Sequence, residues 1–106
     1  MERILISQVK NHTGKQVKIA GFVQTIRDQS KIAFLIIRDS SGTIQAVITK
    51  EAAETLATVK ELTLESVVEI IGTAKEEKQA PGGYEIAVES LKILSRAEPE
   101  LPIPIL

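Results

Sequence analysis

The stretch from Lys31 to Ile48 carries an aromatic ring, Phe34, and a carboxamide, Gln45, in a chain with only two phenylalanines, one tyrosine and no tryptophan. An aromatic ring can stack on an unpaired nucleobase, which contributes about 1–3 kcal/mol per base, and an amide can hydrogen-bond the base edge. Arg27 and Lys31 flank this pair and carry the positive charge that suits phosphates. These residue types fit a single-stranded nucleic-acid site, provided that the fold brings them to one surface.

The pattern of this stretch predicts two strands, residues 31–38 and 43–48, joined by a turn at residues 39–42 that contains Asp, Ser and Gly. Residues two apart share one face of a strand, so Phe34 and Gln45 both lie opposite the face that matches the core. An exposed ring beside an amide suits an unpaired base. The alternative, equally open on the residues alone, is that Phe34 packs under a loop and Gln45 is an ordinary surface residue.

The sequence contains few residues that could act in catalysis or bind a metal ion. The chain has one histidine, His12, in a polar turn, and no cysteine. It lacks a nucleophile motif and a phosphate-binding glycine loop, and its carboxylates do not recur at the spacing of metal ligands. We therefore expect no catalytic residue, no metal and no cofactor in this domain.

The composition sets the class of protein and limits its partners. The chain has 106 residues, of which 43% are hydrophobic and 25% charged, as in one small folded domain. A net charge of -1 argues against strong non-specific binding to a phosphate backbone, but not against reading a few bases. The start has no signal-peptide pattern, and no apolar run reaches the about 20 residues of a membrane span. We expect a cytoplasmic protein with no membrane partner.

The remaining elements complete a barrel pattern. Alternation predicts a strand at residues 16–28, where it places Ile26 on the same face as Phe22 and Gln24, and Gly21 marks a bend or bulge. Helical spacing predicts one helix at residues 50–61, and two further strands follow at 66–75 and 84–94. The order β-β-β-α-β-β predicts an all-β fold, a five-stranded Greek-key OB-fold barrel with one helix between strands three and four. An open sheet with one helix is the rival.

The same residues resemble a specific family, the N-terminal anticodon-binding domain of class II aspartyl- and asparaginyl-tRNA synthetases. The similarity spans essentially the whole chain and rests on short motifs in a fixed order. They are Gly21-Phe22-Val23, Arg27-Asp28, Phe34, Arg38-Asp39, Gly42, Ile44-Gln45, Ile71-Gly72-Thr73 and Gly83-Tyr84-Glu85-Ile86. The tail after Ser95 also resembles the segment that leads into the catalytic domain of that family.

The resemblance implies roles for individual residues. Phe34 would stack on the central uridine of the anticodon, and Gln45 would hydrogen-bond that base. Glu85 stands where the family places a polar or acidic residue that contacts an anticodon base, although bacterial aspartyl enzymes carry an acid where this chain has Ala87. Arg27 matches a basic position near the anticodon stem. With Gln24 and Lys31, these are the residues that we expect to contact RNA.

The resemblance also predicts the domain organisation. Residues 1–95 form the anticodon-binding domain, and residues 96–106, with prolines at 99, 102 and 104, form a linker toward a catalytic domain that this chain lacks. The parent enzyme would be a homodimer that aminoacylates tRNA with ATP and Mg²⁺, and this chain alone would be non-catalytic. The alternatives are a stand-alone OB-fold module that binds single-stranded nucleic acid or protein, and a lysyl-type synthetase domain.

Overall fold

The computed structural model describes residues 1–96 of the chain, and the predicted linker from residue 97 onward lies outside the described residues. Five strands dominate the structure, and each begins and ends within one residue of its predicted range. They are β1 (Gln16–Asp28), β2 (Ile32–Asp39), β3 (Gly42–Thr49), β4 (Val67–Glu76) and β5 (Tyr84–Ser95). Short 3₁₀ helices precede β1 and β5, at η1 (Ile6–His12) and η4 (Pro81–Gly83).

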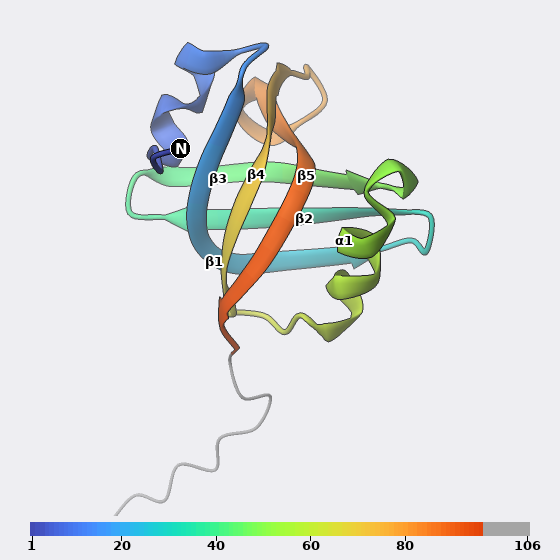
Figure 1. Ribbon diagram of the computed structural model, residues 1–106. Coiled ribbons are helices and arrows are strands. Elements are labelled where there is room, and N and C mark those ends of the chain that lie inside the picture. The colour runs from blue at the N-terminus through green and yellow to red at the C-terminus, as the bar shows by residue number, and fades with distance from the viewer. Residues whose placement is uncertain (97–106) are drawn as a thin grey trace, which may run out of the picture.

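The strands form a closed barrel in the order β1-β2-β3-β5-β4, with β4 pairing back onto β1 (Figure 1). All neighbouring strands are antiparallel except β3 and β5, which are parallel. This closure confirms the predicted OB-fold barrel and excludes the open-sheet rival. It also makes β3, the strand that carries Gln45, a direct neighbour of β5, the strand that carries Glu85.

Alternate side chains along the strands point inward and fill the barrel interior. Leu35 and Ile37 of β2 and Ile44, Ala46 and Ile48 of β3 are buried, as the sequence predicted, while the residues that alternate with them are half-exposed. Because the interior takes one face of each strand, the other face of β2 and β3 is directed outward. Phe34 and Gln45 belong to that outward face.

Two glycines mark the corners where strands pass from one side of the barrel to the other. At Gly21, β1 still pairs with β4, and pairing with β2 begins at the next residue. A Cβ atom at Gly21 would clash with the backbone carbonyl oxygen of Arg38, and one at Gly72 would clash with that of Ala87. Gly21 therefore marks the predicted bend through a close approach of backbones.

A β-bulge in β1 lies at Gln24, not at Gly21. Val23 pairs with Ile37 while Thr25 pairs with Ile36, so Gln24 is the extra residue. An extra residue reverses the facing of everything after it. The predicted outward position of Ile26 is therefore wrong, because Ile26 pairs with Leu35 and packs against the core.

The predicted single helix at residues 50–61 is three shorter pieces. They are η2 (Lys50–Ala52), α1 (Ala53–Thr58) and η3 (Val59–Glu61). The break falls at Ala52, whose backbone (φ -112°, ψ 60°) is not helical. Thr49 caps the start of the segment, since its Oγ1 accepts a hydrogen bond from the backbone N–H of Glu51 at 3.3 Å.

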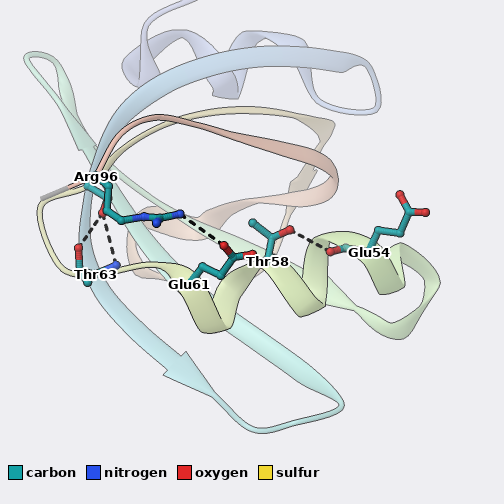
Figure 2. Close-up of polar contacts among 6 residues, drawn as sticks. Glu54, Thr58, Glu61, Thr63 and Arg96 are labelled. Carbon is teal, nitrogen blue, oxygen red and sulfur yellow. Dashed lines mark hydrogen bonds and ion pairs between the residues drawn. The ribbon is translucent and has the colours of Figure 1, made fainter.

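Figure 2 shows polar contacts within this segment and between it and the end of β5. Thr58 Oγ1 donates to the carbonyl oxygen of Glu54 at 3.0 Å, inside the helical segment. Arg96, just after β5, reaches Glu61 Oε1 at 3.4 Å. Both side chains of that ion pair are more than half exposed, so the pair contributes little to stability.

Asp39 fixes the turn between β2 and β3. Its carboxylate accepts hydrogen bonds from the backbone N–H groups of Ile6, Ser41 and Gly42 and from the Ser41 hydroxyl, at 2.6–3.2 Å. Burial acts to raise the pKa of Asp39, but these hydrogen bonds outweigh it and hold the pKa below its usual value. The turn sets the register of the hairpin that carries Phe34 and Gln45.

Candidate nucleic-acid interface

The outward face of β1, β2 and β3 collects the predicted ring, amide and guanidinium. Phe34 pairs with Arg27 of β1 on one side and with Val47 of β3 on the other. Gln45 pairs with Ile36, two residues along β2 from Phe34, so Gln45 lies diagonally across from the ring on the same face. Phe34 and Gln45 are both half-buried.

An open hollow of about 420 Å³ lies over this face. Four of the six predicted RNA-binding residues line it: Arg27, Phe34, Gln45 and Glu85. They come from β1, β2, β3 and β5, so the hollow exists only in the closed barrel. Ring, amide, carboxylate and guanidinium thus face one space, which is the arrangement that binding an unpaired base requires.

Arg27 and Phe34 form a stacked pair. The guanidinium carbon of Arg27 lies over the ring, 5.2 Å from its centroid, within the range of a cation–π interaction. The bulge at Gln24 makes this contact possible, because strict alternation would direct Arg27 toward the interior. Arg27 thus places a cation next to the ring, and both side chains line the hollow.

Gln45 and Glu85 are joined by a hydrogen bond. Gln45 Nε2 donates to Glu85 Oε1 at 3.1 Å, between the adjacent parallel strands β3 and β5. The two residues pair in register, although 40 positions separate them in the sequence. The sequence resemblance named both residues, but nothing in the local pattern indicated that they would touch.

The other two predicted residues lie outside the hollow. Lys31 is exposed in the turn between β1 and β2, and its backbone N–H bonds the carbonyl oxygen of Gln29. Gln24 is the exposed bulge residue, and its role in the fold is to shift the register. Their contact with RNA stays a prediction.

Sequence reasoning missed two further lining residues, Glu77 and Gln79, from the loop between β4 and β5. The sequence of this loop, which is polar and ends in Pro-Gly-Gly, by itself indicates only a turn. Its equivalent in OB-folds commonly takes part in oligonucleotide binding, and that is the signal that could have found these residues. Apolar walls are supplied by Ile32 and Val47.

The charges around the hollow favour base edges over phosphates. One cation, Arg27, faces two carboxylates, Glu77 and Glu85. Carboxylates accept hydrogen bonds from base N–H groups but repel phosphate oxygens. Among residues 1–96, no cluster of three or more His, Cys, Asp or Glu side chains is arranged to hold a metal ion. No helix in the same range is long and apolar enough to span a membrane.

A second arginine–phenylalanine pair lies at the other end of the same face. Arg38 stacks on Phe22 with its guanidinium carbon 5.3 Å from the centroid, and it also bonds Glu65 at 2.9 Å. The ring of Phe22 is 42% exposed, so Phe22 is a surface aromatic and not part of the core. Neither residue lines the hollow, which makes this pair a natural control for Arg27 and Phe34.

Comparison with known proteins agrees with this geometry. The sequence model of the tRNA anticodon family, described as an OB-fold nucleic acid binding domain, matches residues 17–94. An asparagine–tRNA ligase of Pelotomaculum thermopropionicum is 42% identical over 101 residues, which cover 93% of this chain and 24% of the relative. An aspartate–tRNA(Asp/Asn) ligase of Methanocorpusculum labreanum is 42% identical over 105 residues, 97% of this chain and 24% of the relative.

A solved structure gives the same result. The asparaginyl-tRNA synthetase of Pyrococcus horikoshii, complexed with asparaginyl-adenylate, matches with a TM-score of 0.84 at 39% identity, over 98% of this chain and 24% of that chain. The chain therefore spans about a quarter of the length of these relatives. It belongs to the tRNA anticodon family of OB-fold nucleic acid binding domains that asparaginyl- and aspartyl-tRNA synthetases carry.

Proposed function

We propose that this domain binds the anticodon loop of the tRNAs for aspartate or asparagine and reads the central uridine. The observation that carries the proposal is the hollow in which Phe34, Gln45, Glu85 and Arg27 meet from four different strands. Phe34 supplies the stacking surface, and Gln45 supplies a hydrogen-bond donor and acceptor for the base edge. Family membership supports RNA as the ligand.

The charge distribution supports a reader of bases with modest affinity. The chain has a net charge of -1, and two carboxylates line the hollow, so phosphate attraction contributes little to binding. Arg27, together with Lys31 in the adjacent turn, would contact the phosphates on either side of the flipped base. In this arrangement stacking and edge recognition carry the specificity.

The larger protein is part of the same proposal. A C-terminal catalytic domain in the same chain would use ATP and Mg²⁺ to esterify the amino acid to the tRNA that this domain holds. The relatives at 24% coverage are ligases of this kind. We further propose a homodimeric parent enzyme in the cytoplasm.

The test is a titration of the 106-residue chain with anticodon stem-loops that differ only in the middle base. We expect binding that prefers uridine and that falls by about tenfold in Phe34→Ala, the loss expected for one stacking contact. Phe22→Ala is the matched control, because it removes the other phenylalanine ring that lies under an arginine, away from the hollow. Thermal unfolding of both variants checks that the fold is retained.

Three results would contradict the proposal. Equal binding to stem-loops with any of the four bases in the middle would contradict the proposal that this domain recognises the anticodon. Equal losses in Phe34→Ala and Phe22→Ala would show that binding does not depend on the hollow. Unfolding of the Phe34→Ala variant would show that the ring is structural.

A further inference from the structure

The hydrogen bond between Gln45 and Glu85 fixes the orientation of the Gln45 amide. A carboxylate only accepts hydrogen bonds, so the amide atom 3.1 Å from Glu85 Oε1 must be the NH₂ group, because an amide oxygen there would be repelled. Both side chains are half-buried and come from adjacent strands in register, which limits their freedom. Glu85 thus holds the NH₂ group of the Gln45 amide.

The oxygen atom of the same planar Gln45 amide, Oε1, is directed away from Glu85. Within residues 1–96, Gln45 makes no side-chain hydrogen bond besides the one to Glu85. β3 lies between β5 and β2, so Glu85 stands on one side of Gln45 and Phe34 on the other. The amide therefore offers a hydrogen-bond acceptor to a base stacked on the ring.

The direction of an amide matters for telling the two pyrimidines apart. Uracil and cytosine have the same ring size, so stacking and the volume of the hollow treat them alike. At N3, however, uracil carries an N–H donor and cytosine a lone pair. An amide free to rotate by a half turn can satisfy either base, whereas an amide held with its oxygen toward N3 satisfies only uracil.

We propose that Glu85 is a positioning residue that sets the preference for uracil over cytosine at the middle base by holding the Gln45 amide in one orientation. This inference rests on the proposed function and adds to Glu85 a role that acts through Gln45. It does not depend on whether Glu85 also contacts a neighbouring base of the anticodon, because the stem-loops compared differ only in the middle base.

The decisive variant is Glu85→Gln, which keeps the size of the side chain. A glutamine at this position both donates and accepts, so it permits both orientations of the Gln45 amide. Glu89→Gln is the matched control. It removes one carboxylate from the same strand, and Glu89 bonds Gln16 and Thr73, not Gln45. Any general gain in RNA affinity from removing a negative charge appears in both variants.

Two measurements are made on the 106-residue chain. The first is the ratio of affinities for stem-loops with uridine or cytidine in the middle. We expect about tenfold preference for uridine in the unmodified protein and in Glu89→Gln, and about twofold or less in Glu85→Gln. The second is the NMR spectrum of the Gln45 side-chain NH₂ without RNA, where only Glu85→Gln should reduce the shift of the hydrogen-bonded proton, because the amide then adopts both orientations.

The outcomes separate this inference from the proposed function. If the unmodified protein does not distinguish the middle bases, the proposed function is wrong. If it prefers uridine and Glu85→Gln keeps that preference, the positioning role is wrong while the proposed function stands. Equal loss of preference in Glu85→Gln and Glu89→Gln would also overturn the positioning role, because charge alone would then explain it.

Discussion

Arg27 of β1 and Phe34 of β2 are cross-strand partners, and the guanidinium carbon of Arg27 lies 5.2 Å from the centroid of the Phe34 ring. The contact depends on the bulge at Gln24, which turns Arg27 from the interior side of β1 to the outward side. The ring proposed to stack on a base therefore lies next to a cation that an uninterrupted strand would have directed toward the interior. This relationship leads to the first two predictions.

Two substitutions of Arg27 distinguish the contribution of its positive charge to RNA binding from the contribution of its stacking on Phe34. We expect Arg27→Ala to weaken stem-loop binding about fivefold and to lower the slope of log affinity against log salt by about 0.7, the value for one contact to a single strand. Arg27→Lys should restore the slope but not the full affinity, because lysine lacks the planar group that stacks on the ring.

The measurement is the dissociation constant at several salt concentrations, with Arg38→Ala as control. Arg38 also stacks on a phenylalanine but does not line the hollow, so its loss should leave RNA affinity unchanged. A salt slope that does not change in Arg27→Ala would contradict a phosphate contact.

Deletion of Gln24 should prevent stable folding. Without the extra residue, Ile26 would turn outward and Arg27 would turn toward the core, and burying an unpaired charge costs several kcal/mol. Gln24→Ala keeps the bulge and should change the free energy of unfolding by no more than about 0.5 kcal/mol. Urea unfolding of both variants tests this. A deletion variant as stable as the alanine variant would show that the bulge is dispensable.

The two corner glycines should tolerate alanine less well than a turn glycine. A Cβ atom at Gly21 or Gly72 meets a backbone carbonyl oxygen that cannot move without opening the barrel, so we expect each alanine variant to lose about 1–3 kcal/mol or more. At Gly14 the positive φ of 84° costs strain, but nothing lies within 4 Å of an added Cβ. Gly14→Ala should therefore lose less stability than either corner variant. A lower free energy of unfolding for Gly14→Ala than for the Gly21 and Gly72 variants, measured by chemical denaturation, would contradict this expectation.

Protonation of Asp39 should account for part of the loss of stability in acid. Its folded-state pKa is lowered, so the stabilisation is fully present above the unfolded value of about 3.9 and is lost as pH falls through the folded pKa. We expect Asp39→Asn to lose about 1–2 kcal/mol at neutral pH and to show a weaker decline as the pH falls below about 4.

Glu69 provides the comparison. Its pKa is lowered chiefly by the hydrogen bond from Arg3; burial opposes this, and the charges of Lys18, Arg3 and Lys92 add to the lowering. Glu69→Gln should therefore also flatten the acid decline, with little loss at neutral pH because the ion pair with Arg3 is on the surface. An unchanged acid decline in Asp39→Asn would refute the assignment to Asp39.

Much of the fold could be predicted because its signals are local. Alternation located all five strands to within one residue, and Asp39 and Gly42 indicated the turn between β2 and β3. The helical segment was predicted with correct bounds but as one helix, because spacing alone does not reveal the non-helical backbone at Ala52. The bulge escaped prediction because no residue type at Gln24 demands it.

Local pattern is enough to place Phe34 and Gln45 on the outward face of one hairpin, since strand parity and a short turn act over a few residues. The contacts of Arg27 with Phe34 and of Glu85 with Gln45, in contrast, follow from how the strands assemble. The first depends on the register between β1 and β2, and the second on the parallel pairing of β3 with β5 that closes the barrel. Both contacts join separate strands, and their partners are chosen when the barrel buries its core, not by any local preference of the chain.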